Sequence, residues 1–179
     1  MKQIVRHVKI IGTGSYVPET VYTNEYLETI SSTNGAWIEE NLGIKERRIA
    51  LPNHTTSDLV AEAGRKAIEK AGLKPDDIDL IIVATATPDR LAPSTAAIVQ
   101  DKLKAYNSVA FDLADVCSGF LFCIATASQF IATGVYNNSV FIGTDTFPKI
   151  IDWSRRDCVF FGDGTGAAVL SNTETDGVF

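Results

Sequence analysis

The stretch 111–134, FDLADVCSGFLFCIATASQFIATG, decides the fold that this sequence predicts. A β-like run, Ser108–Leu113, leads into it. A helical pattern then extends from Ser118 to Gly134, and glycine commonly follows the last turn of a helix. Cys117 is therefore predicted where a strand passes into a helix. The free N–H groups and partial positive charge of a first helical turn favour thiolate over thiol, and the thiolate is the nucleophile.

The helix in this stretch is apolar nearly all round. Its apolar residues leave no continuous polar face: Phe120, Leu121, Phe122, Cys123, Ile124, Ala125, Ala127, Phe130, Ile131 and Ala132. A helix of this kind is expected to be buried, which places Cys117 at the start of a central buried element. The alternative is that Cys117 is one more buried small hydrophobe, the usual fate of a free cysteine. That interpretation is kept for Cys123 and Cys158.

Composition limits the classes of function. The chain has 179 residues, the length of one domain, and its 45% hydrophobic content is ordinary for a globular protein. A net charge of -6 argues against a nucleic-acid surface. Three cysteines without close spacing predict neither a disulfide framework nor a structural zinc site, and His7 and His54 are too far apart to suggest metal ligation. No secretory signal or membrane-spanning run is visible, so a soluble, cytoplasmic protein without a metal is expected.

Apolar runs alternate with helical patterns along the rest of the chain. Strands are predicted at 8–15, 80–84, 139–143 and 167–170, and helices at 24–30, 37–42, 57–71 and 94–104. The charged run Lys45–Arg48 is interpreted as a solvated connection. The alternation indicates an α/β protein with a largely parallel sheet and helices on both faces. Sites in such sheets lie beyond the carboxyl ends of the strands, which is where Cys117 falls and which favours a site residue.

Two glycine-rich stretches do not complete a nucleotide-binding motif. Gly12-Thr13-Gly14 lacks the third glycine of a dinucleotide fingerprint, and no helical pattern follows it. The run from Gly162 to Gly166 lacks the Lys-Ser or Lys-Thr pair of a phosphate loop, so a tight turn is expected there.

Four segments in chain order resemble one family. They are GIKERRIA at 43–50, TTSDL at 55–59, DVCSGF at 115–120 and FGDGTGAA at 161–168. Together they resemble the amino-terminal half of β-ketoacyl-acyl-carrier-protein synthase III, a condensing enzyme of the thiolase superfamily. The resemblance implies half of a thiolase-like fold, in three α/β/α layers, with a five-stranded, mostly parallel mixed sheet and a buried central helix after the catalytic cysteine. Residues 1–179 would form this single domain, without the carboxyl-terminal half of the family fold.

The resemblance also implies a chemistry. Cys117 would accept an acyl group from acyl-CoA, and decarboxylative condensation with malonyl acyl carrier protein would follow, initiating fatty-acid or related chains. Trp37, Thr33 and Arg155 match residues that bind coenzyme A, which acts as a substrate carrier with no permanently bound cofactor. The family's catalytic histidine and asparagine belong to the other half, so this chain alone is expected to be inactive in condensation. A homodimer through the edge strand Ser108–Leu113 is implied as well.

Two alternatives stay open at this point. The chain resembles the thiolase superfamily widely enough to be another condensing enzyme, of the hydroxymethylglutaryl-CoA synthase or long-chain head-to-head type. It could instead be a non-catalytic partner subunit that contributes only a surface.

Overall fold

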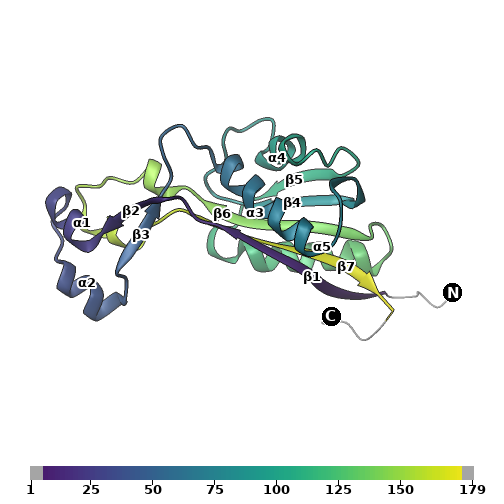
Figure 1. The fold of residues 1–179 in the computed structure, drawn as a ribbon, viewed down its shortest axis with the longest axis horizontal. Helices are drawn as coiled ribbons and strands as arrows, with labels where there is room; N and C mark the ends of the chain where they lie inside the picture. Colours follow the sequence, from purple (N-terminus) through teal and green to yellow (C-terminus); the bar gives the residue numbers. More distant parts are fainter. Residues whose placement is uncertain (1–5, 175–179) are drawn as a thin grey trace.

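The computed structural model describes residues 6–174 and has a five-stranded sheet at its centre (Figure 1). The strand order is β1-β7-β6-β4-β5. The strands are β1 (His7–Tyr16), β4 (Leu80–Ala84), β5 (Val109–Leu113), β6 (Asn138–Asp145) and β7 (Gly164–Thr173). β4 pairs in parallel with β5 and β6, while β7 pairs antiparallel with β6 and β1. Only β7 therefore runs against the other four strands, which confirms the mostly parallel mixed sheet.

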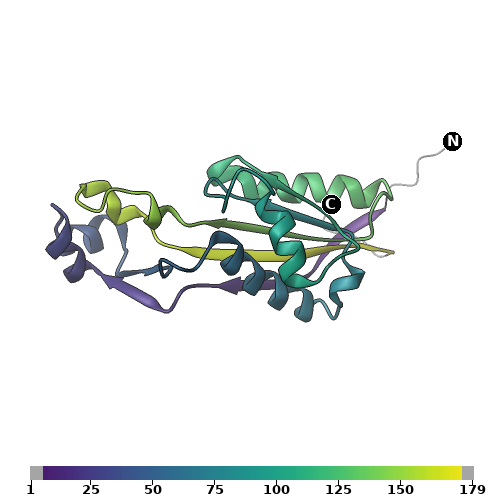
Figure 2. The same cartoon turned by 90° about the horizontal axis from the view of Figure 1, so that it is seen from above.

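Helices cover both faces of this sheet. α3 (Thr56–Lys70) and α4 (Thr95–Leu103) lie on one face, and α5 (Gly119–Ala132) lies on the other (Figure 2). Alternate residues of β4 serve the two faces: Leu80 and Ile82 pack with α5, and Ile81 packs with α3 and α4. Every residue of β4 is buried, which explains its uninterrupted apolar run.

The glycines of β1 allow α3 to approach the sheet closely. A Cβ atom at Gly12 would lie 2.4 Å from the carbonyl oxygen of Ala67, and one at Gly14 would lie 2.2 Å from that of Ala63. These distances are shorter than any real contact, so only glycine fits at either position. The Gly12-Thr13-Gly14 motif is therefore explained by packing between a strand and a helix.

A small end module extends from one end of the sheet (Figure 1). It contains the antiparallel pair β2 (Thr20–Thr23) and β3 (Glu46–Ile49) with α1 (Asn24–Ile30) and α2 (Gly35–Leu42). Its own hydrophobic cluster is built on four buried residues: Leu27, Ile38, Cys158 and Val159. The module therefore joins residues 20–49 to the segment that precedes β7.

The prediction of a solvated connection at Lys45–Arg48 is wrong. These residues fall mostly within β3, and Arg47 is only 6% exposed. Its guanidinium donates hydrogen bonds to the backbone oxygens of Tyr22 and Val159 and to the side chain of Asn24. These three acceptors make burial of the cation tolerable, because each replaces a hydrogen bond to water.

The prediction that α5 is buried all round is also wrong for the chain as it stands. One side of α5 packs on the sheet through Cys123, Ala127 and Ile131. On the other side the side chains of Leu121 and Phe122 are 67% and 52% exposed. The reason is that no layer formed by residues 6–174 covers that side. Among residues 6–174, no helix is long and apolar enough to cross a membrane.

Candidate active site

Cys117 lies in a short 3-10 turn, Val116–Ser118, between β5 and α5. α5 begins at Gly119, so the cysteine precedes the first helical turn and does not lie within it. Its side chain is exposed, which corrects the expectation of a buried setting. A Cβ atom at Gly119 would lie 2.9 Å from that of Ala84. Glycine at this position therefore lets the start of α5 lie directly against the end of β4 and fixes the place of the cysteine.

Val116, immediately before the cysteine, has an unusual backbone. Its φ angle of 43° lies in the left-handed region, which a β-branched residue rarely adopts. Such a conformation costs about 1–3 kcal/mol and persists only where the surroundings impose it. The turn that presents Cys117 is therefore strained, and sequence patterns carried no sign of it.

A cavity of about 380 Å³ opens beside Cys117. It is lined by Ala84, Val116, Cys117, Phe120, Gly143, Thr144, Asp145 and Gly166. Ala84 ends β4 and Asp145 ends β6, and both strands point their carboxyl ends at the cavity. This confirms the sequence-based placement of Cys117 at the carboxyl edge of the sheet. An accessible thiol facing a partly apolar cavity is suited to accept an acyl group.

The carboxylate of Asp145 organises one wall of this cavity. Its Oδ1 atom accepts hydrogen bonds from the Thr85 hydroxyl (3.2 Å), the Ala86 amide (2.7 Å) and the Thr87 hydroxyl (3.2 Å). The Thr87 hydroxyl also accepts a bond from the Thr146 amide (2.8 Å). These contacts join the end of β6 to the loop after β4. Sequence analysis missed Asp145 because its donors lie about sixty residues earlier in the chain.

The other two cysteines are not available as nucleophiles. Cys123 and Cys158 are both buried. Burial raises the pKa of the Cys123 thiol to about 12, so this thiol stays protonated at neutral pH. Cys117 is thus the one accessible thiol, and all three cysteines fall within the described part of the chain.

The residues predicted to bind coenzyme A lie in and beside the end module. Trp37 is on α2, with its amide capped by Asn34, and Thr33 lies just before that helix. The Thr33 hydroxyl oxygen is buried and has no hydrogen-bond partner among the described residues. None of these residues lines the Cys117 cavity.

Trp37 contacts Arg156, the neighbour of the predicted coenzyme A residue Arg155. The guanidinium of Arg156 lies over the indole ring, 4.3 Å from its centroid, in a cation–π contact. Arg155 instead forms a two-point ion pair with Asp157, at 3.0 and 3.1 Å. Sequence reasoning missed Arg156 because two adjacent arginines cannot be assigned to different partners from their order alone.

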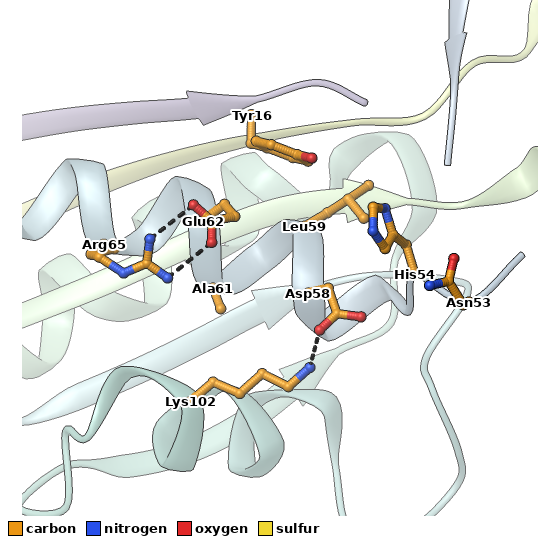
Figure 3. Close-up of a pocket in the computed structure, with 9 residues that line it drawn as sticks. All are labelled: Tyr16, Asn53, His54, Asp58, Leu59, Ala61, Glu62, Arg65 and Lys102. Atoms are coloured by element: carbon orange, nitrogen blue, oxygen red, sulfur yellow. Dashed lines mark hydrogen bonds and ion pairs between the residues drawn. The ribbon is translucent and has the colours of Figure 1, made fainter. Parts of the chain in front are cut away.

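A larger cavity, of about 630 Å³, lies beside α3 (Figure 3). Its charged groups are already paired: Lys102 lies 2.5 Å from Asp58, and Arg65 forms two hydrogen bonds with Glu62. Burial alone would raise the pKa of Asp58, but hydrogen bonds from Lys102 and from the Thr55 amide and hydroxyl hold it at about 2. This carboxylate therefore stays ionised at neutral pH.

No group of three or more metal-ligating side chains occurs within residues 6–174. The cysteine cavity, with its single thiol and single carboxylate, is the arrangement that the fold places at a catalytic position.

Comparison with known proteins agrees with the fold. The family model of 3-oxoacyl-[acyl-carrier-protein] synthase III matches residues 111–179. Beta-ketoacyl-[acyl-carrier-protein] synthase III of Caldanaerobacter subterraneus is 54% identical over 93% of this chain, and that of Clostridium acetobutylicum is 51% identical over 96%. The crystal structure of the Aquifex aeolicus synthase superposes with a TM-score of 0.91 at 44% identity, covering 94% of this chain and 55% of that one. The alignments include only 50% and 53% of the two curated relatives. The chain is thus similar to β-ketoacyl-[acyl-carrier-protein] synthase III proteins and spans about half the length of the curated relatives it matches.

Proposed function

We propose that this chain is the nucleophile-bearing half of a β-ketoacyl-acyl-carrier-protein synthase III. The observation that carries the proposal is the exposed thiol of Cys117 beside a cavity at the carboxyl edge of the sheet. Similarity to β-ketoacyl-[acyl-carrier-protein] synthase III proteins supports the same role. As in the resemblance drawn from the sequence, residues 1–179 would form one domain of a two-domain fold.

The first half-reaction is a transfer between two thiols. The Cys117 sulfur attacks the carbonyl carbon of an acyl-CoA, a new thioester forms, and coenzyme A leaves as the thiol after taking up the proton that Cys117 released. In the second, malonyl acyl carrier protein loses carbon dioxide and its carbanion attacks the acyl group, which frees Cys117. The backbone N–H of Cys117 is one donor to the oxyanion of the tetrahedral intermediate. The histidine and asparagine of the second half-reaction belong to the other half of the family fold.

Coenzyme A is proposed to bind at the end module, through Trp37, Thr33 and Arg155. The partnerless buried hydroxyl of Thr33 supports a ligand there, because such a group costs free energy until it is bonded. Arg156 joins this set through its contact with Trp37. Coenzyme A is a substrate carrier here, and the reaction is proposed to take place in the cytoplasm.

A homodimer through β5 is part of the proposal. β5 is an edge strand, paired only with β4 in the described sheet, and Val109 on it is half exposed. An apolar edge without lysine or proline favours pairing with a second copy.

The test has two arms. Mass spectrometry after incubation with a panel of acyl-CoAs should detect slow acylation at Cys117 and none in a Cys117→Ser variant. Condensation should be absent with this chain alone and should appear when the carboxyl-terminal half of the Caldanaerobacter relative is added in trans. Losing one oxyanion donor typically costs about a hundred- to a thousand-fold in rate, so condensation at an ordinary enzyme rate by the chain alone would contradict the proposal.

A further inference from the structure

A cavity of about 440 Å³ lies between β1 and α3 and shares no residue with the Cys117 cavity. We call it the basic groove, and it is lined by Thr13, Gly14, Ser15, Lys66 and Lys70. Its two charged side chains are both lysines, one turn apart on α3, and none of the lining residues is acidic. Neither lysine forms an ion pair with any residue in the range 6–174. The basic groove therefore concentrates positive charge that no side chain of its own lining balances.

The backbone of β1 adds hydrogen-bond donors to this groove. β1 is an edge strand and pairs only with β7 in the described sheet. The Asn172 amide donates to the backbone oxygen of Asn137, so the even-numbered residues of β7 turn their backbone groups towards β6. Ser15 lies opposite one of these residues, Gly166. Because the N–H and C=O of a strand residue share one side, those of Ser15, and of Thr13 two residues earlier, point away from β7 to the open edge.

Lys66 makes this edge better suited to an anion than to a further strand. Its ammonium group donates to the backbone oxygen of Ser15 at 3.0 Å and lies 5.6 Å from the centre of the Tyr16 ring. An ammonium group has three donors, so it can still donate to a ligand. A lysine across an edge hinders pairing with another strand, and the register shift between Ile10 and Gly12 interrupts the same edge. What the edge still offers is its amide donors.

We propose that the basic groove binds a ligand with two adjacent phosphate groups. A sheet edge with free amides is an anion-binding surface, and lysine is a common partner of phosphate. The amides of Thr13 and Ser15 are about 6.6 Å apart, because they are two residues apart along a strand. This spacing exceeds the separation of two oxygens on one phosphate group and allows each amide to bond to a different group. Lys66 and Lys70 then neutralise part of the charge of the ligand.

The basic groove is separate from the sites of the proposed function and goes beyond that function. α3 and α5 lie on opposite faces of the sheet, and the proposed other half of the fold would cover α5. The proposed homodimer would use β5, at the opposite edge of the sheet from β1. The basic groove therefore stays accessible in the proposed assembly.

Calorimetric titration of the 179-residue chain with inorganic pyrophosphate tests the proposal. At about 0.15 M salt, where exposed charges are screened beyond about 8 Å, Lys70→Gln should weaken binding about tenfold, which corresponds to about 1.4 kcal/mol. Adding Lys66→Gln should weaken binding by at least about a hundredfold overall, since both cations are then lost. A wild-type chain that does not bind pyrophosphate, or a Lys70→Gln variant that binds it equally well, would overturn the proposal.

Lys9→Gln is the matched control, because it removes the same charge from another exposed lysine. Lys9 lies on β1 four residues before Thr13, about 13 Å along the strand. This distance exceeds the screening length, so Lys9→Gln should leave the affinity within about twofold of the wild-type value. Equal weakening by Lys9→Gln and Lys70→Gln would show attraction to net charge alone and would overturn the proposal.

Hydrogen–deuterium exchange provides a measurement on the unaltered chain, which keeps the proposal testable if a variant does not fold. The amides of Thr13 and Ser15 should exchange fast without a ligand, and pyrophosphate should slow both. Orthophosphate, with one phosphate group, should protect them less. Exchange that pyrophosphate does not change would overturn the proposal. So would protection that appears without any ligand and grows with protein concentration, because the edge would then be paired with a second copy.

Two ligands distinguish the source of the diphosphate. If ADP protects both amides at least as well as pyrophosphate, the ligand is a nucleotide, and if pyrophosphate alone protects them, it is the free anion. Either result supports the site. Neither measurement depends on acylation of Cys117, so the basic groove and the proposed function fail independently.

Discussion

Val116 presents the nucleophile through a backbone conformation that its own side chain disfavours. The φ angle of 43° costs about 1–3 kcal/mol in a β-branched residue, and glycine adopts it freely. The side chain is 55% exposed, so little burial is lost when it is removed. Val116→Gly should therefore raise the free energy of unfolding by about 1 kcal/mol, after the extra entropy of glycine in the unfolded chain is deducted. Urea denaturation followed by circular dichroism measures this.

Val109→Gly is the matched control for this substitution. Val109 has a similar exposure, 50%, but lies in the extended strand β5. Glycine there should lower the free energy of unfolding by about 1 kcal/mol, because no strain is relieved. Destabilisation of the same size in both variants would show that the turn at Val116 is not strained.

Asp163 gives a dependence of stability on pH with a defined sign. It is 4% exposed, and burial raises its pKa, although a hydrogen bond from the Ala50 amide and the charge of Lys149 act in the opposite direction. A carboxyl whose pKa is raised by folding stabilises below its unfolded pKa, near 4, and this contribution is lost as pH rises through the folded pKa. The free energy of unfolding of Asp163→Asn, relative to wild type, should therefore increase between pH 4 and pH 7.

Asp58→Asn should show the opposite trend. The pKa of Asp58 is held at about 2, so its stabilisation is present above pH 4 and is lost as pH falls from about 4 to about 2. At pH 7 the substitution should cost about 1 kcal/mol, since the ion pair with Lys102 is partly exposed and screened by solvent. Parallel pH trends in the two variants would contradict both pKa assignments.

At this scale the sequence predicts residues whose role depends on near neighbours. The helices expected at 24–30 and 94–104 begin within one residue of the expected positions, because Thr23 and Ser94 each accept a hydrogen bond from an amide only three residues ahead. Arg47 and Asp145 were missed because their partners come from distant segments. The backbone of Val116 was missed because valine carries no preference for a left-handed conformation.

The first amides of helix α4 donate hydrogen bonds to a carboxylate from another element. Both oxygens of Asp112, on the edge strand β5, accept amide hydrogen bonds at 2.7 Å, one from Thr95 and one from Ala96. The cap residue Ser94 accepts the next amide, that of Ala97, at 3.2 Å. Asp112 thus ties β5 to α4 and also places a negative charge at the positive end of the helix.

Asp112→Ala should destabilise the protein more than loss of the local cap. The change removes two charge-assisted hydrogen bonds and leaves two amides without a partner, at a cost of about 2–3 kcal/mol. Ser94→Ala removes one neutral bond and should cost about 1 kcal/mol. Denaturant midpoints at constant m-value compare the stabilities of the two variants. Equal losses of stability would show that Asp112 contributes no more than the local cap.

Element prediction succeeded where a pattern was long and failed where it was short. The fifteen-residue α3 and the apolar run of β4 were both found, because each shows its periodicity over its whole length. The four-residue strands β2 and β3 were missed. Their polar side chains carry no apolar alternation, and the two strands pair across more than twenty intervening residues, which local patterns do not record.

At the scale of the whole molecule, one apolar face is left uncovered by the described part of the chain. Leu121 and Phe122 on α5 and Val116 before it are each more than half exposed, beside the Cys117 cavity. The chain spans about half the length of its relatives, and the proposed function assigns this face to the other half of the fold. In the proposed two-domain fold the other half would cover this side of α5, which would account for its all-apolar sequence.

Two uncovered surfaces on one chain predict assemblies larger than a dimer. The edge of β5 pairs with its copy through one two-fold contact, and the α5 face associates through a second, so both contacts together extend into an open series. Sedimentation velocity of the 179-residue chain should show species that grow with concentration.

The double variant Leu121→Glu with Phe122→Glu should leave a dimer with unchanged thermal stability, since both side chains point away from the core. Adding Val109→Lys should reduce that dimer to a monomer, whereas Ile150→Glu, a similarly exposed position in the segment between β6 and β7, should change nothing. A wild-type chain that sediments as a single small species at all concentrations would show that neither surface associates.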